Sequence, residues 1–155
     1  MKPIYRQALK EVSERVFEEL AFMFADSDPG DLEAWEREKS YLKAEIAFQG
    51  PVSGSLWIAA PPAFCRELAA NILGLDGDEL SAREKAEDAL KELVNIVCGH
   101  FLTRTAGEDP LFTISPPEAR EVARPDAGNE EPLRLLVEDY PVALNVTLNN
   151  GRGAR

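Results

Sequence analysis

Apolar residues recur along the chain at two spacings, one helical and one strand-like. Over residues 3–25 they recur at steps of three and four, which predicts an amphipathic helix with one apolar stripe. The same spacing predicts a short helix over residues 63–73 and a long helix over residues 82–105. Residues 26–40 form an acidic connector, in which a short helical turn is expected around Trp35.

Alternating apolar and polar residues predict a hairpin early in the chain and further strands after the long helix. The hairpin turns at Gly50-Pro51, whereas residues 116–132 are predicted to form a loop, in which a further short element could be hidden. The expected strands cover residues 42–49, 52–59, 111–115, 133–138 and 142–149. The last of them alternates cleanly, and if it forms a sheet edge it could pair with another subunit.

The predicted elements follow the order helix, hairpin, helix, long helix, strands. This order is typical of an α+β fold with a single β-sheet and helices packed mainly on one side of it. A length of 155 residues favours one domain, expected over residues 1–155, that is large enough to bury its own core.

The composition mainly excludes classes of partner. Lys and Arg number 17 against 28 Asp and Glu, and the resulting charge of −11 argues against nucleic acid or an anionic membrane. The longest uncharged stretch, residues 46–65, is interrupted by glycines and prolines and does not predict a transmembrane helix. Charged residues from Arg6 to Arg15 stand where a signal peptide needs an apolar run, so a cytoplasmic protein is expected.

Cysteine and histidine are too scarce for several common kinds of site. Cys65 and Cys98 make no disulfide framework, and the helical spacing around Cys65 predicts a small core side chain. His100 is the single histidine, so no His-based metal cluster or Ser-His-Asp triad can be assembled. It falls near the edge of the core face of the long helix, where a hydrogen-bonded structural histidine is favoured over a catalytic one. A site in this chain has to work with carboxylates and amides.

The long helix carries the pattern that points to a site. At 100° per residue its apolar residues fall on one side, which is expected to face the sheet. Asp88, Glu92, Asn95 and Gly99 fall on the opposite side, within an arc of about 60°. We call these four residues the acid–amide row.

Two interpretations of the acid–amide row are open from the residues alone. Exposed acids and amides on a helix are usually a solvated surface, and Asp88 and Glu92 at this spacing even repel slightly. Gly99 favours a functional interpretation, because glycine inside a helix costs about 1 kcal/mol relative to alanine. It lies where a side chain would stand between Asn95 and anything that docks from outside.

The string Asp88-x3-Glu92-x2-Asn95-Ile96-x2-Gly99 resembles the signature of the CheC–FliY–CheX family of chemotaxis phosphatases. The order of the predicted elements resembles that family as well, so the resemblance covers most of the chain. It implies a hydrolase of chemotaxis signal transduction, whose substrate is the aspartyl phosphate of a CheY-type response-regulator receiver.

Members of this family contain two related helix-hairpin halves, and a trace of the repeat is visible here. Shifting the long helix back by 74 residues places the row on Glu14, Glu18, Ala21 and Ala25, which are expected on the outward side of the first helix. The acids are kept there, but the amide is missing. This resembles the CheX branch, which has one active copy, rather than CheC, which has two; chance similarity between two amphipathic helices is the alternative.

The resemblance also implies roles for the row. The receiver holds its own Mg²⁺, so no metal or other cofactor is expected on this chain, and hydrolysis still needs a water in line with the phosphorus. Glu92 and Asn95 are the implied catalytic residues. Asn95 would hold that water, since a carboxamide offers a donor and an acceptor on one rigid group. Glu92 would pair with the receiver's lysine. Asp88 and Gly99 are the implied partner-binding positions. Asp88 would add a peripheral contact, and Gly99 would permit close approach of the receiver because it has no side chain.

Two other functions fit the same residues. The chain could be a non-catalytic binding module that docks a receiver or a flagellar-switch protein through the acid–amide row. It could also be a structural dimerisation domain in which the row is only a solvated surface.

CheX-like proteins form dimers through their sheets, so the resemblance further implies a homodimer. Phe22 is expected to project from the polar side of the first helix, where it could be a contact residue.

Overall fold

The computed structural model describes residues 1–26, 32–74, 83–109, 111–125, 128 and 130–149. Within these residues the helices are α1 (Pro3–Ala21), α2 (Leu32–Glu36), α3 (Pro62–Leu73) and α4 (Arg83–Ala106). The strands are β1 (Ala25–Asp26), β2 (Tyr41–Gln49), β3 (Ser53–Ala60), β4 (Thr113–Ile114), β5 (Glu118–Val122), β6 (Leu133–Val137) and β7 (Tyr140–Asn149). The predicted hairpin, the short helix, the long helix and the turn around Trp35 are all present.

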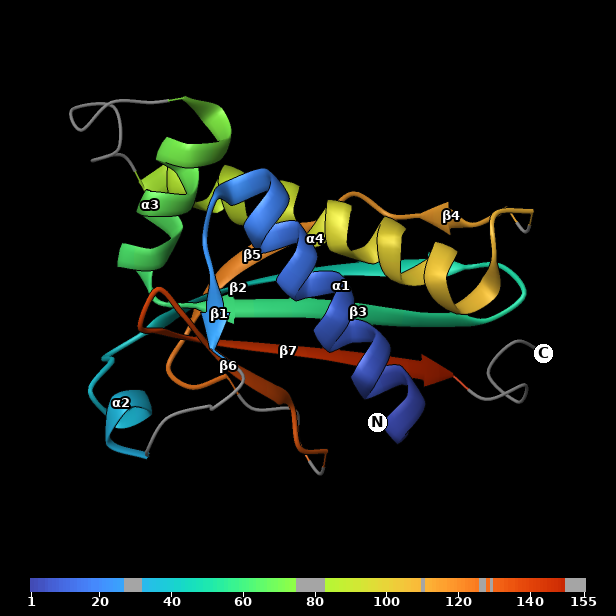
Figure 1. Ribbon diagram of the computed structural model, residues 1–155, viewed down its shortest axis with the longest axis horizontal. Helices are drawn as coiled ribbons and strands as arrows, with labels where there is room; N and C mark the ends of the chain where they lie inside the picture. Colours follow the sequence, from blue (N-terminus) through green and yellow to red (C-terminus); the bar gives the residue numbers. More distant parts are fainter. Residues whose placement is uncertain (27–31, 75–82, 110, 126–127, 129, 150–155) are drawn as a thin grey trace.

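The described strands form one antiparallel sheet of seven strands in the order β1-β6-β7-β3-β2-β4, with β5 also paired to β2. Helices α1, α3 and α4 lie together on one side of this sheet, as Figure 1 shows. The predicted α+β fold, with one sheet and helices mainly on one side, is therefore confirmed. None of the helices in the described ranges is both long and apolar enough to cross a membrane.

The main core lies between the sheet and the three long helices. Strands β2 and β3 turn every second side chain toward the helices, because successive residues of a strand point to opposite faces. Helix α1 adds Leu9, Val12 and Phe17 to this core. The rings of Phe17 and Phe64 meet edge to face with their centroids 6.2 Å apart, which ties α1 to α3.

A second and smaller apolar cluster covers the opposite face of the sheet beside α2. It consists of Trp35, Tyr41, Trp57, Ala59 and Ala143. The Tyr41 hydroxyl donates a hydrogen bond of 2.9 Å to the carbonyl oxygen of Trp35, so the polar tip of this buried ring is satisfied. This cluster explains why α2 lies apart from the other helices.

Strand β7 lies inside the sheet between β6 and β3, so the condition for its pairing with another subunit, a place at the sheet edge, is not met. Its Leu144 pairs with Leu133 of β6 on one flank and with Ile58 of β3 on the other. Alternation along a strand indicates which of its faces is apolar, but it carries no information about which strands lie beside it.

Helix α1 ends at Ala21, earlier than residue 25, where the apolar spacing predicted its end. Phe22 adopts a left-handed backbone conformation with φ of 56°, and the N–H groups of Phe22 and Met23 both donate to the carbonyl oxygen of Phe17. This capping turn stops the helix. The apolar spacing continues past it because Met23 is still buried, although it is no longer helical.

Strand β5 occupies part of residues 116–132, which were expected to form a loop. It pairs antiparallel with residues 41–45 of β2. Three of its five residues are Glu118, Arg120 and Glu121, so the apolar alternation that marks a strand is weak. Charged residues of this kind are common on outer strands, where they discourage pairing with other chains.

Candidate functional site

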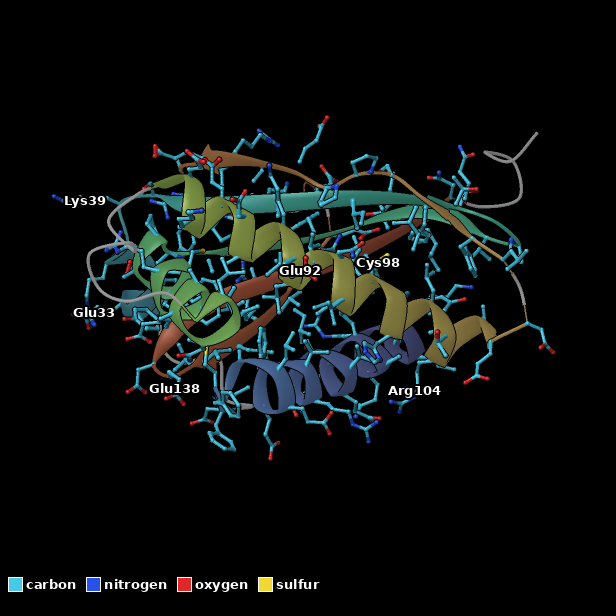
Figure 2. All side chains as sticks on the ribbon, turned by 90° about the horizontal axis from the view of Figure 1, so that it is seen from above. Glu33, Lys39, Glu92, Cys98, Arg104 and Glu138 are labelled. Atoms are coloured by element: carbon cyan, nitrogen blue, oxygen red, sulfur yellow. The ribbon has the colours of Figure 1, made fainter. Side chains whose placement is uncertain are left out.

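Helix α4 places the acid–amide row on the side that faces away from the sheet. Asp88, Glu92 and Asn95 are exposed, and Gly99 is half-buried. The opposite side of the helix is buried at Ala86, Leu90, Leu93, Val94, Val97 and Phe101. Figure 2, which looks onto the helices from above, labels Glu92 on α4. The predicted orientation of the long helix is therefore confirmed.

Neighbouring elements hold α4 in this orientation. The helix packs on β2 and β3, with α3 and α1 alongside it. Near its C-terminal end, the ring centroid of Phe101 lies 6.3 Å from that of Tyr5, and Arg104 forms an ion pair with Glu11 of α1. A helix fixed along one whole side presents the row as a single rigid unit.

The side chains of the row are available to another molecule. Within the described part of the chain, no hydrogen bond or ion pair engages the side chain of Asp88, Glu92 or Asn95. A Cβ atom built at Gly99 would meet nothing within 4 Å. Packing inside the chain therefore does not explain why a glycine stands at this position, despite its cost to the helix.

Two grooves beside α4 bring basic side chains close to this acidic surface. The groove toward α1 has a volume of about 560 Å³ and is lined by Glu11, Val12, Arg15, Val16, His100, Thr103 and Arg104. The groove toward β5 has a volume of about 420 Å³ and is lined by Lys43, Glu45, Lys91, Pro117, Glu118, Ala119 and Arg120. Sequence reasoning missed this arrangement because most of these side chains come from segments distant from α4 in the chain.

His100 is exposed in the groove toward α1. No described residue forms a hydrogen bond with its side chain, so the expectation of a hydrogen-bonded structural histidine is wrong. Helical spacing does put it next to the buried side of α4, but α1 leaves a gap at this point. The residue therefore lies on the surface beside Gly99, where it is accessible to solvent.

The two cysteines are free and buried. Burial raises the pKa of the Cys65 thiol to about 12 and that of the Cys98 thiol to about 11, because a low-dielectric surrounding disfavours the thiolate. Reactive cysteines need a lowered pKa and access to solvent, so the prediction of a core side chain at Cys65 is confirmed. Among the described residues, no group of three or more His, Cys, Asp or Glu side chains is placed to hold a metal ion.

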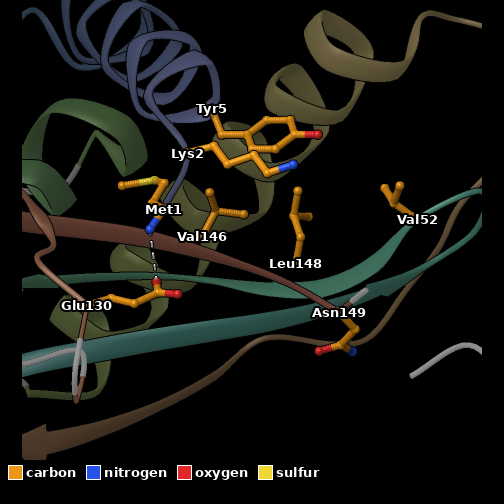
Figure 3. A pocket seen from close by; sticks show the side chains of 8 residues that line it. All are labelled: Met1, Lys2, Tyr5, Val52, Glu130, Val146, Leu148 and Asn149. Atoms are coloured by element: carbon orange, nitrogen blue, oxygen red, sulfur yellow. Dashed lines mark ion pairs between the residues drawn. The ribbon is translucent and has the colours of Figure 1, made fainter. Parts of the chain in front are cut away.

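A further pocket of about 330 Å³ lies between the start of α1 and the end of β7 (Figure 3). Val52, Val146 and Leu148 form its apolar wall. The N-terminal ammonium of Met1 lies 3.6 Å from a carboxylate oxygen of Glu130 across it. None of its lining residues belongs to α4, so this pocket is separate from the acid–amide row.

Helix α1 repeats the row only in part. Glu14 is half-buried and Glu18 is exposed, but Ala21 is fully buried and Ala25 lies in β1. The expectation of an outward position is therefore wrong for Ala21 and Ala25. The cause is the turn at the end of α1 together with α3, whose Asn71 amide donates a hydrogen bond of 2.7 Å to the Ala21 carbonyl oxygen.

The chain matches the model of a protein family described as chemotaxis phosphatase CheX over residues 43–126. This stretch is more than half of the chain and contains the whole acid–amide row. No curated protein sequence matches the chain significantly.

Several solved structures resemble the fold at low sequence identity. A CheX chemotaxis protein from Desulfovibrio desulfuricans is 11% identical with a TM-score of 0.69, and the match covers 94% of this chain and 99% of that chain. A CheC-like protein from Shewanella sp. PV-4 is 18% identical with a TM-score of 0.67, covering 97% and 100%. A CheX–CheY–BeF3–Mg²⁺ complex from Borrelia burgdorferi matches with 16% identity, a TM-score of 0.61, and coverage of 94% and 98%. At these identities the likeness is one of fold, and it extends over nearly the whole chain.

Proposed function

This chain belongs to the chemotaxis phosphatase CheX family, and on that premise we propose that it hydrolyses the aspartyl phosphate of a CheY-type receiver. One observation carries the proposal: the exposed carboxamide of Asn95 follows the exposed carboxylate of Glu92 by about one turn of α4, and no described residue engages either group. The Borrelia burgdorferi structure contains CheX together with CheY, BeF3 and Mg²⁺, which supports a receiver as the class of partner.

In the proposed reaction a water attacks the phosphorus in line with the bond to the aspartyl oxygen. That phosphorus–oxygen bond breaks, the aspartate leaves as a carboxylate, and inorganic phosphate is released. The amide N–H of Asn95 donates to the water oxygen while its carbonyl oxygen accepts from the water. Because the acyl phosphate is already activated, the main contribution of this chain is the position of the water.

The other residues of the row set the register of the proposed complex. Glu92 forms a charge-assisted hydrogen bond with the lysine of the receiver. Asp88 adds a contact at the periphery, and the missing side chain at Gly99 lets the receiver approach α4 closely. The receiver brings the Mg²⁺, so the proposal requires no metal ligand from this chain.

The direct test follows the loss of phosphate from a phosphorylated CheY-type receiver at substoichiometric amounts of this protein. We expect acceleration by the wild type and a rate at least about 100-fold lower for Asn95→Ala, since misplacing one reactant costs on that scale. Receiver binding, measured by fluorescence anisotropy, should change much less. Asn149→Ala removes an exposed amide at the end of β7 and is the matched control, with full activity expected.

The possible outcomes separate the proposals. No acceleration by the wild type would refute the enzymatic function, whereas acceleration that survives Asn95→Ala would refute only the assigned mechanism. The second candidate is a non-catalytic docking module, which the exposed and unengaged row also fits. That candidate predicts receiver binding without acceleration, and loss of binding in Glu92→Lys.

We further propose a homodimer formed through an edge of the sheet. Strand β7 is not available for this contact because it is interior, so the outer strands β1, β4 and β5 are the candidates. Light scattering coupled to size exclusion should give twice the 17.1 kDa of one chain. A monomeric mass over the whole accessible concentration range would contradict the dimer.

A further inference from the structure

Exposed apolar side chains gather where α1 and α3 end. They belong to Leu20, Phe22, Phe24 and Leu73, which expose 36%, 72%, 61% and 41% of their surface. We call this group the α1–α3 patch, and none of its members lies on α4. Single exposed apolar residues are ordinary, but a group of them on adjoining segments is typical of an interaction surface.

Two hydrogen bonds hold the segments of the patch together. The side-chain amide of Asn71, in the last turn of α3, donates 2.7 Å to the carbonyl oxygen of Ala21 at the end of α1. The backbone N–H of Phe24 donates 3.1 Å to a carboxylate oxygen of Glu138, between β6 and β7. Figure 2 labels Glu138 at this end of the molecule. Three segments distant in sequence therefore build one surface.

Phe22 stands in a backbone conformation that its side chain disfavours. Its φ of 56° lies in the left-handed region, which glycine usually occupies at the end of a helix. Helix α3 follows that rule, with Gly74 at φ 66° in the same position. A non-glycine residue in this conformation is strained, and such strain is typical of positions that have a function. The largely exposed ring is the feature that a partner would select.

The surroundings of the patch are acidic. The C-terminal ends of α1 and α3 lie at the patch, and each carries the partial negative charge of its helix dipole. Neither helix has a basic residue in its last turn. The acidic side chains on the segments that build the patch include Glu18, Glu19, Glu67, Glu138 and Asp139. Arg15 lies 3.9 Å from Glu19, and Arg66 precedes Glu67, so the acids on these segments outnumber the bases.

We propose that the α1–α3 patch docks an amphipathic segment of a partner protein in which Lys or Arg residues flank apolar side chains. The apolar side chains of the segment pack on Phe22 and Phe24, and its cations meet the acids, the two helix ends and the faces of the rings. Charge complementarity argues against an anionic lipid surface, which these acids repel. This docking function does not depend on the phosphatase proposal.

The test uses the whole chain and a fluorescein-labelled synthetic peptide of Leu and Lys, with Leu at helical spacing. Phe22→Asn/Phe24→Ser removes both rings, and asparagine tolerates the left-handed conformation, so the fold should persist; thermal unfolding followed by circular dichroism checks this. Glu18→Lys is a second variant, which keeps the rings and reverses one exposed charge. Leu111→Ser removes a side chain that is 89% exposed outside the patch and is the matched control.

We expect the Leu-Lys peptide to bind the wild type and Leu111→Ser, and to bind the double variant at least about tenfold more weakly. Glu18→Lys and added salt should also weaken binding, and neither a Leu-Glu peptide of the same spacing nor anionic vesicles should bind. Equal binding to the double variant, or equal binding of the two peptides, would overturn the proposal. So would a dimer that dissociates only in the double variant, because a second copy would then cover the patch.

Discussion

A Cβ atom at Gly54 of β3 would lie 2.1 Å from the carbonyl oxygen of Thr147 in β7. No side chain fits at this distance, so the two strands approach this closely only because position 54 has none. We expect Gly54→Ala to lower the free energy of unfolding by about 3 kcal/mol, at the upper end of the penalties for overpacking. Urea denaturation followed by circular dichroism measures this change, and an unchanged midpoint would contradict it.

Gly99 should respond in the opposite way, since a Cβ there meets nothing within 4 Å. Gly99→Ala is expected to raise the free energy of unfolding by up to about 1 kcal/mol, because alanine favours the helix. If the position provides clearance for a receiver, Gly99→Leu should keep this stability but lower dephosphorylation at least about tenfold, a loss of about 1.4 kcal/mol in the transition state. A leucine variant with full activity would show that no close approach occurs at this residue.

Glu92 is expected to contribute to dephosphorylation of the receiver but not to the stability of the fold. Glu92→Gln keeps the shape of an exposed side chain but removes its charge, so the free energy of unfolding should hardly change. The kcat/KM for a phosphorylated receiver should fall at least about 30-fold, because a lysine of the receiver would lose its charged partner inside the interface. Glu18→Gln on α1 is the matched control, and an equal loss in both variants would indicate general electrostatic attraction instead.

Alkaline pH should destabilise the fold through three buried groups. Burial raises the pKa of Tyr41 from 10.0 to about 12, that of Cys65 from 9.0 to about 12, and that of Cys98 from 9.0 to about 11. At a pH between the ordinary and the raised pKa values, these three groups are deprotonated in the unfolded chain but still protonated in the folded protein. The free energy of unfolding should therefore be unaffected by these groups below pH 9 and should fall as the pH rises from 9 toward 12.

Urea midpoints measured at increasing pH test this dependence. The Cys65→Ala/Cys98→Ala variant should lose less stability between pH 9 and 11 than the wild type, whatever its stability at neutral pH. Parallel curves for the two proteins would show that the thiols do not contribute.

Local patterns in the sequence determined the helices, the hairpin and the outward side of α4. A helix of fixed pitch has one apolar side, and that side must be buried, so Leu90, Leu93 and Val97 by themselves place Glu92 and Asn95 toward solvent. The same spacing put the acids and the amide in one row. For this reason the candidate site could be proposed before any contact between segments was known.

Only the tertiary structure decided what lies beside that row and how the sheet is ordered. The interior place of β7, the pairing of charged β5 with β2 and the exposure of His100 all depend on segments far apart in the chain. The end of α1 is likewise secured by a bond from Asn71 to Ala21, fifty positions apart. Spacing along a chain reports which side of one element is apolar, whereas the neighbours of that element are chosen by the packing of the whole core.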